Sequence, residues 1–302
     1  MTDRIRRSFL YTPADTESLM RKAPDHDADA VIYELEDGIA VADKGTAREN
    51  LSILADLEFD NQEVCVRINS LNTKWWFKDL RAALDAGVDT VVIPKVNYAW
   101  QIRAAVETTR QMASDPPEFL FFVERSAGWV NVGEITTTCS DHPEVTGVLP
   151  GNEFSAAVGA SNLEGRARIH VLTEMTKYAP LGGLDLYNPL SLELEDMGYL
   201  RDFASEAREL GYRGMVAVAP NQLDVINEVF TPSEAEYEAA KTVVEKFDAT
   251  DAGGVLIEEA GFVDRPIVNP YRRTINRYNR VNDIDERYEI EDVYGTPDES
   301  MS

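Results

Sequence analysis

Cysteine, histidine and lysine are scarce in this chain of 302 residues. The two cysteines, Cys65 and Cys139, form no metal-binding or redox motif, and the three histidines share no metal-binding spacing. Two isolated thiols indicate a reducing compartment, so we expect a cytoplasmic protein in which both cysteines are small buried residues. No apolar run approaches the ~20 residues that cross a bilayer, and no signal-peptide core follows the basic N-terminus.

The balance of charge is the unusual feature of the composition. Fifty-four acidic residues face 29 basic ones, of which eight are lysine, and the formal net charge is −25. The acidic residues are spread along the chain and are not confined to one tail. Such a balance excludes nucleic acid and anionic membranes as general partners. It is typical of a protein that works in concentrated salt, where screening removes most of the repulsion, so we predict a halophilic protein.

Short apolar runs alternate with amphipathic segments over residues 8–230. A run followed by a helical pattern recurs eight times, which is typical of an α/β protein with a (β/α)8 TIM barrel. A doubly wound sheet would carry a glycine-rich turn after its first strand, and the segment Thr12-Pro-Ala-Asp lacks one. We therefore predict a catalytic barrel domain over residues 1–230 and a C-terminal helical extension, with a lid and an acidic tail, over residues 231–302. The predicted strands are residues 8–12, 30–35, 63–68, 90–94, 119–123, 145–149, 183–187 and 214–219. The predicted helices are residues 16–23, 44–57, 75–86, 98–113, 132–139, 164–177, 198–210 and 223–230, with 234–247 and 271–280 in the extension.

Two of these apolar runs are each followed closely by a glutamate. Glu124 follows residues 119–123, and Glu153 follows residues 145–149 after a Pro-Gly-Asn turn. Glu153 comes 29 residues after Glu124, which is about one strand–helix unit, so we expect the two acids side by side on neighbouring parallel strands. Hard oxygen ligands suit Mg²⁺, with Mn²⁺ as an alternative ion. The alternative interpretation is two acids in unrelated loops.

Other polar residues follow almost every predicted strand, at the end where a barrel keeps its chemistry. Asp37 and Glu36 are expected to hydrogen-bond the waters of the metal or Arg67; alternatively they are solvated loop acids. We expect Lys95 to be a salt-bridge partner of these acids, because nearby carboxylates oppose the depressed pKa that a Schiff-base lysine needs. The set comprises Thr12, Glu34, Glu36, Asp37, Arg67, Asn69, Lys95, Glu124, Asn152, Glu153, Asp185, Asn188, Asn221 and Gln222.

A series of short motifs runs through the chain. They are Arg7-Ser-Phe-Leu-Tyr-Thr-Pro, Ala30-Val-Ile-Tyr-Glu-Leu-Glu-Asp-Gly with Lys44 and Arg48 downstream, Val66-Arg-Ile-Asn, Ile93-Pro-Lys-Val, Val123-Glu, Glu153 with Gly159, Phe230-Thr-Pro-Ser and Val263-Asp-Arg-Pro. In order and spacing this series resembles the HpcH/HpaI aldolase and citrate lyase β-subunit family, acyl-CoA lyases with a barrel fold. The match covers about residues 4 to 275, and the chain looks like an acidic, haloarchaeal-type member.

The resemblance implies roles for several residues. It implies that Arg67 binds substrate oxygen atoms and that Glu124 and Glu153 hold Mg²⁺. It also implies that Asp264 reaches the site of a neighbouring subunit as an acid/base, so a homotrimer or homohexamer is expected. The candidate catalytic residues are Arg67, Asp37 and Asp264, and the candidate substrate contacts are Arg67, Glu124, Asn152, Thr12 and Lys22, the last of these toward CoA phosphates.

The implied reaction is Mg²⁺-dependent cleavage of malyl-CoA or β-methylmalyl-CoA to glyoxylate and an acyl-CoA. The alternatives are a citramalyl-CoA lyase that gives pyruvate and acetyl-CoA, a malyl-CoA thioesterase, and a non-catalytic homologue that binds acyl-CoA. The sequence departs from the family pattern at several positions. Glu153 stands where relatives usually have Asp, Arg125 replaces a usual Thr, and Ala14 a usual Gly. Met215 and Ala219 replace the usual Lys and His. The sequence therefore does not determine the acyl chain of the substrate or the pocket for the acyl carrier.

Overall fold

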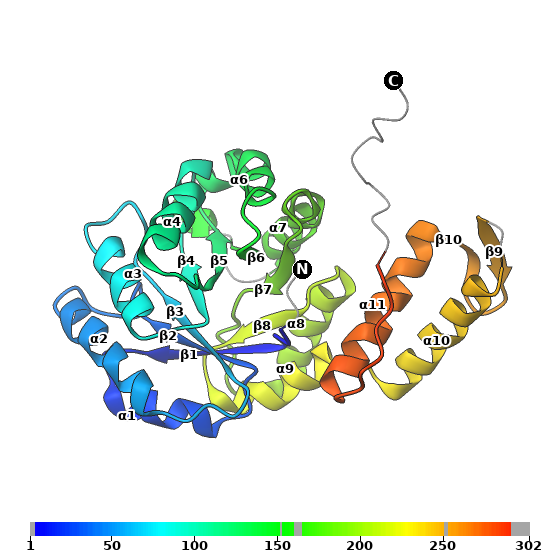
Figure 1. Ribbon diagram of the computed structural model, residues 1–302, viewed down its shortest axis with the longest axis horizontal. Coiled ribbons are helices and arrows are strands. Elements are labelled where there is room, and N and C mark those ends of the chain that lie inside the picture. The colour runs from blue at the N-terminus through cyan, green and yellow to red at the C-terminus, as the bar shows by residue number, and fades with distance from the viewer. Residues whose placement is uncertain (1–3, 152, 160–164, 251–252, 291–302) are drawn as a thin grey trace. The chain divides into compact units, whose positions relative to one another are not determined.

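The computed structural model describes residues 4–151, 153–159, 165–250 and 253–290. Residues 1–230 form one compact unit, in which eight parallel strands pair in sequence order and β8 closes on β1 (Figure 1). The predicted (β/α)8 barrel is therefore confirmed. The strands are β1 (Ser8–Pro13), β2 (Ala30–Glu34), β3 (Glu63–Arg67), β4 (Thr90–Ile93), β5 (Glu118–Val123), β6 (Val145–Pro150), β7 (Asp185–Asn188) and β8 (Gly214–Ala217).

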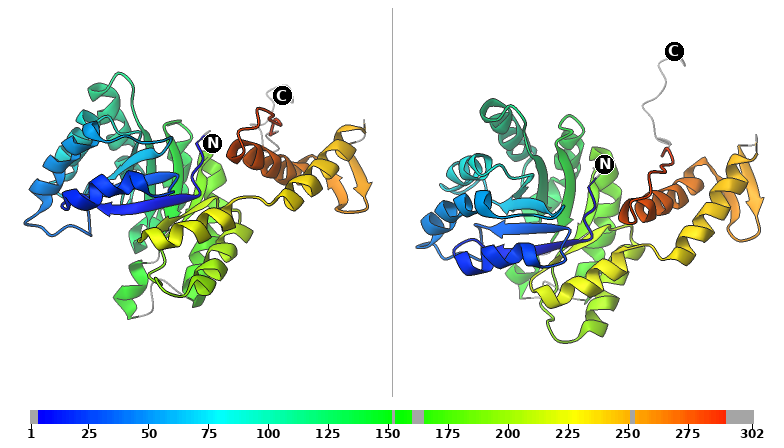
Figure 2. Two further views of the ribbon diagram at one scale, coloured as in Figure 1. Left: turned by 90° about the horizontal axis from the view of Figure 1, so that it is seen from below. Right: turned by 60° about the horizontal axis from the view of Figure 1, so that its bottom comes forward.

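Helices surround this ring of strands, as the two views of Figure 2 show. The predicted helix over residues 44–57 ends at Asn50, and a 3₁₀ helix, Leu51–Asp56, continues it. The short helix α5 (Ser126–Val130) after β5 was not predicted. Among the described residues, no helix has the length and apolar character that a membrane span requires. The helices are α1 (Glu17–Lys22), α2 (Lys44–Asn50), α3 (Trp76–Asp85), α4 (Ala99–Met112), α5 (Ser126–Val130), α6 (Val132–Cys139), α7 (Gly165–Tyr178), α8 (Met197–Glu209) and α9 (Leu223–Phe230).

Alternate residues of the strands fill two separate apolar layers. Phe9, Ile32 and Phe122 belong to a cluster built from strand residues, which fills the inside of the barrel. Their neighbours Leu10 and Val31 belong to the larger cluster that the strands share with the helices. The alternation follows from the period of two in a strand, and it decides which side chains can face the barrel mouth.

Charged side chains close the amino end of the barrel. Arg6 Nε lies 2.6 Å from Glu63 Oε2, and its Nη2 lies 2.6 Å from Glu118 Oε2. Its Nη1 also donates to Thr146 Oγ1 at 2.9 Å. Since Glu63 and Glu118 begin β3 and β5, this network lies at the end of the barrel opposite to the carboxyl ends of the strands. It stabilises the barrel floor and leaves the mouth to other residues.

Residues 231–302 form a second compact unit with a core of its own. Helices α10 (Glu234–Asp248) and α11 (Arg265–Val281) run side by side, with an antiparallel hairpin of β9 (Gly254–Ile257) and β10 (Gly261–Asp264) (Figure 1). The rings of Tyr237 and Tyr278 stack at 4.3 Å between α10 and α11. Helix α11 begins six residues before the predicted helix of residues 271–280, because Asp264 caps it and a proline lies in its first turn.

Candidate active site

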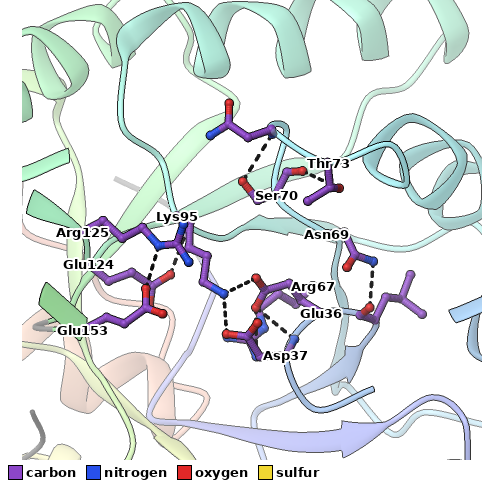
Figure 3. A network of polar contacts seen from close by, with 12 residues as sticks. Glu36, Asp37, Arg67, Asn69, Ser70, Thr73, Lys95, Glu124, Arg125 and Glu153 are labelled. Carbon is purple, nitrogen blue, oxygen red and sulfur yellow. Dashed lines mark hydrogen bonds and ion pairs between the residues drawn. The ribbon is translucent and has the colours of Figure 1, made fainter. Parts of the chain in front are cut away.

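The carboxyl ends of five neighbouring strands bring acids and cations together, and Figure 3 shows how their side chains lie. Arg67 is the last residue of β3, and Glu34 is the last residue of β2. The other members follow strands directly or after a short turn: Glu36 and Asp37 after β2, Lys95 after β4, Glu124 and Arg125 after β5, and Glu153 after β6. Because the carboxyl ends of parallel strands meet at one edge, residues far apart in sequence become neighbours here.

Arg67 is held between acids and aromatic rings. Its Nε donates to Glu34 Oε2, and its Nη2 lies 3.7 Å from Glu36 Oε2. Its guanidinium carbon lies 4.7 Å from the ring centroid of Tyr11 and 5.6 Å from that of Phe122. Burial opposes the charge, but Tyr11 and Glu34 outweigh it, so the pKa of Arg67 lies above its ordinary value. The result is a fixed cation whose planar donors suit carboxylate or enolate oxygens.

Lys95 joins the two acids that follow β2. Its Nζ donates to Glu36 Oε1 at 2.6 Å and to Asp37 Oδ2. Burial favours the neutral amine, but the bonds to Asp37 and Glu36 raise the pKa of Lys95. Burial alone would also raise the pKa of Asp37, yet the Lys95 ammonium holds it below its ordinary value. Lys95 is therefore a salt-bridge residue, as predicted, and not a neutral amine ready to form a Schiff base.

Glu124 directly follows β5, and its side chain is half-buried. Its Oε1 accepts a hydrogen bond from the backbone N of Lys95 at 3.0 Å. Burial raises the pKa of Glu124 to about 7; Glu36 and Glu153 add to the rise, and Arg67 opposes it. Gly151 lies against this side chain, since a Cβ there would come within 2.6 Å of Glu124 Cβ. A carboxylate in this setting is stabilised by a cation placed beside it.

Glu153 lies next to Glu124, and the two side chains point the same way in Figure 3. Arg125 Nε donates to Glu153 Oε2 at 2.9 Å. The backbones of the two strand ends are also tied together: Gly151 N donates to Val123 O at 2.7 Å, and Phe154 N donates to Glu124 O at 3.2 Å. The predicted meeting of Glu124 and Glu153 on adjacent strands is thus observed.

The donor set fits a magnesium ion. Five carboxyl groups share the cluster with three cations, and burial raises the pKa of Glu34 and of Glu124, so a further positive charge placed here would stabilise the carboxylates. Within the described ranges, no group of three or more Asp, Glu, His or Cys side chains is arranged to hold a metal. Mg²⁺ commonly takes one or two carboxylates and completes its octahedral shell with water and substrate oxygens. Glu124 and Glu153 supply such a pair. The cluster consists of Glu34, Glu36, Asp37, Glu124 and Glu153 with Arg67, Lys95 and Arg125.

Residues behind the site hold the loop after β2. Lys44 Nζ donates to Leu35 O at 2.7 Å and to Glu36 O at 2.5 Å. Asn69 Nδ2 donates to Leu35 O at 2.8 Å and to Asp79 Oδ2 at 2.6 Å. Asp79, which is buried on α3, was not among the predicted site residues. The available signal was a charged residue on the apolar face of a helix, preceded in the motifs by Asn69 and Arg48, which are its partners in the structure.

Two of the predicted site residues, Thr12 and Lys22, do not join this cluster. Thr12 is buried and pairs in register with Tyr33, a residue of the layer between strands and helices. Lys22 is exposed at the end of α1, which runs back toward the amino end of the barrel. Asp264 belongs to the second unit, where its Oδ1 accepts from Ile267 N at 3.1 Å and caps α11. Asn152 lies outside the described residues.

The two replaced family positions lie at strand β8 and just after it. Met215 is fully buried, and its Sδ accepts a hydrogen bond from Asn188 Nδ2 at 3.4 Å. Ala219 precedes a 3₁₀ turn in which Gln222 Oε1 accepts from Ala219 N at 3.3 Å. Neither side chain brings a charge to the barrel mouth, so the cations of the cluster come from β3, β4 and β5 alone among the described residues.

Comparisons with known proteins agree with this architecture. A (3S)-malyl-CoA thioesterase of Cereibacter sphaeroides is 29% identical over 274 residues, which cover 89% of this chain and 93% of that protein. The mitochondrial citramalyl-CoA lyase of Mus musculus is 27% identical over 280 residues, covering 87% and 83% of the two chains. The CitE protein of Mycobacterium tuberculosis, solved with magnesium, acetoacetate and coenzyme A, superposes with a TM-score of 0.73 at 26% identity and covers 90% of this chain and 97% of its own. The sequence profile of one family matches residues 7–220, and the chain belongs to that family, the HpcH/HpaI aldolase/citrate lyase family.

Proposed function

We propose that this chain is a Mg²⁺-dependent carbon–carbon lyase that cleaves malyl-CoA or β-methylmalyl-CoA to glyoxylate and an acyl-CoA. The observation that carries the proposal is the pair of carboxylates, Glu124 and Glu153, beside the fixed cation Arg67 at the barrel mouth. Family membership supports the reaction class, since the family contains lyases of CoA esters. The magnesium in the CitE structure supports the choice of ion.

The proposed reaction breaks the bond between C2 and C3 of the hydroxyacyl-CoA. The 3-hydroxyl proton leaves, C3 becomes the aldehyde carbon of glyoxylate, and the electron pair of the broken bond moves into a thioester enolate, which then takes a proton at C2. Magnesium held by Glu124 and Glu153 would polarise the oxygens of the hydroxy-acid end. Arg67, held in place by Glu34 and Tyr11, would donate to substrate oxygens on which negative charge develops.

Two aspartates are the proposed proton carriers. Asp37 is ionised beside Lys95 and is largely exposed, so it can accept the hydroxyl proton. Asp264 is proposed to protonate the enolate from a neighbouring subunit. This role requires a homo-oligomer, and we propose a homotrimer or homohexamer in which residues 231–302 serve as lid and tail for the barrel domain of residues 1–230. A lid carboxylate that enters with substrate also excludes water from the enolate.

Hydrolysis of the same thioester is a second candidate function. The relative named as a (3S)-malyl-CoA thioesterase supports it, and a metal-bound acid is equally useful for either reaction. Citramalyl-CoA is the alternative lyase substrate, supported by the mouse relative. One methyl group in the acyl pocket is worth only ~1–3 kcal/mol, so the choice depends on a few side chains.

We further propose that the enzyme works in the cytoplasm of a halophilic organism. Both cysteines are free and buried, which suits a reducing compartment. The net charge of −25 suits concentrated salt.

The test supplies Mg²⁺ with malyl-CoA or citramalyl-CoA and measures keto acid and free thiol. Keto acid without free thiol is the expected result and identifies a lyase; free thiol without keto acid identifies a hydrolase. Glu124→Gln and Glu153→Gln should each abolish turnover while the fold is kept. Glu228→Gln, an exposed glutamate on α9 outside the cluster, is the matched control and should keep full activity. Wild-type rates for either site variant in saturating Mg²⁺ would remove that carboxylate from the proposed site, and absence of both products would favour a non-catalytic homologue.

A further inference from the structure

Arg125 is the one cation of the active-site cluster that pairs with a proposed metal ligand. It follows Glu124 directly and has an extended backbone, with φ −109° and ψ 157°, as the N-cap of α5. This conformation lets its side chain reach across to the end of β6, where Nε donates to Glu153 Oε2 at 2.9 Å (Figure 3). Both side chains are partly exposed, 49% for Arg125 and 38% for Glu153.

The other two cations of the cluster, Arg67 and Lys95, form ion pairs with acids other than Glu124 and Glu153. Arg67 is engaged by Glu34 and Glu36, and Lys95 by Glu36 and Asp37. Arg125 instead adds its positive charge at Glu153, and that charge also acts on Glu124. Its presence therefore reduces the negative charge that a divalent ion meets at this pair of carboxylates.

We propose that Arg125 is a positioning residue that competes with Mg²⁺ for Glu153 and so weakens the affinity of the site for the ion. The proposal rests on the proposed function, in which Glu124 and Glu153 hold the metal. A guanidinium hydrogen bond and a metal ion cannot use the same lone pair of Glu153 Oε2. Binding of the ion through that lone pair therefore requires the hydrogen bond from Arg125 to break. Its half-exposed side chain has room to move into solvent. A neighbouring positive charge also repels the ion whether or not the hydrogen bond is made.

The size of the effect follows from this exposure. A unit charge a few ångströms from the ion would change its affinity by orders of magnitude in a dry interior, but water at the mouth screens most of that interaction. We therefore expect removal of the charge to tighten Mg²⁺ binding by about threefold to tenfold. Added salt should shrink this difference, because the interaction is at a solvent-exposed edge of the site.

The experiment titrates Mg²⁺ calorimetrically into the whole chain, without substrate, at low and high KCl. Arg125→Gln removes the charge and keeps a hydrogen-bonding side chain, whereas Arg125→Lys keeps the charge. Arg201→Gln is the matched control, because it removes the same charge from an exposed pair with Glu228, outside the cluster. We expect tighter binding for Arg125→Gln at low salt, a smaller gain at high salt, and dissociation constants within about twofold of wild type for Arg125→Lys and Arg201→Gln. Thermal melting of each variant checks the fold.

Unchanged or weaker Mg²⁺ binding by Arg125→Gln, while Glu124→Gln loses binding, would overturn the role of Arg125 and leave the metal site standing. Equal tightening by Arg201→Gln would overturn it as well, because the effect would then be one of total charge. If Glu124→Gln binds Mg²⁺ as the wild type does, the ion is not at this site. The proposed metal centre and the role of Arg125 then fall together.

Discussion

Replacing Glu124 by glutamine should inactivate the enzyme and, at alkaline pH without metal, make its fold more stable. Burial is the main reason that the pKa of Glu124 is about 7, against an ordinary value of 4.5. Between these two pH values the native state binds more protons than the unfolded state, so the free energy of unfolding falls as the pH rises. This decrease in the free energy of unfolding is complete above pH 7, and it is absent below pH 4.5.

The difference between the two pKa values corresponds to about 3 kcal/mol, which we reduce to about 2–3 kcal/mol because part of Glu124 meets solvent. Glutamine has nearly the same shape and no charge to desolvate. In EDTA at pH 8, Glu124→Gln should therefore unfold at a higher urea concentration than wild type, and the gap should shrink by about 2 kcal/mol at pH 5.5. Mg²⁺ at 100 times its dissociation constant should raise the free energy of unfolding of the wild type by about 2.7 kcal/mol.

Urea denaturation followed by circular dichroism measures each of these quantities. Mg²⁺ should raise the free energy of unfolding of Glu124→Gln only slightly, because one of the two anionic ligands is missing. Glu228→Gln serves again as the control for loss of a carboxylate, and it should show the pH dependence of wild type. Parallel pH dependences for wild type and Glu124→Gln would refute the reasoning, since no buried charge would then be relieved by the substitution.

Three further predictions follow from other parts of the chain. Arg6→Ala should lower the free energy of unfolding by about 3–5 kcal/mol in urea denaturation, because it leaves Glu63 and Glu118 without their buried partner; a loss below about 1 kcal/mol would contradict this. The melting temperature should rise between ~0.1 M and ~2 M KCl, since a net charge of −25 is then screened, and a flat profile would count against a halophilic protein. Asp264→Asn should bind Mg²⁺ and substrate but turn over slowly, and mixed oligomers with Glu124→Gln should recover part of the activity. No recovery despite confirmed subunit exchange would mean that Asp264 does not serve a neighbouring subunit.

The alternation of eight apolar runs and amphipathic segments determined the barrel. Strand and helix periods are local properties of the chain, so the strand positions were predicted to within one or two residues. The meeting of Glu124 and Glu153 was also predictable, because one strand–helix unit in a parallel barrel returns the chain to the neighbouring position on the same edge. The start of α11 was predicted too late, because Pro266 and Pro270 obscured the first turns of the helix.

Only the tertiary structure decided which charged groups pair. Arg67 bonds to Glu34, Lys95 to Glu36 and Asp37, and Arg125 to Glu153, and each partner is 28 or more residues away. Strand order brings such residues near one another, but register and side-chain rotamers select the partner, and no local pattern encodes them. The same limit applies to Thr12: the sequence placed it near a strand end, whereas the register of β1 with β2 set its side chain on the helix side of the barrel wall.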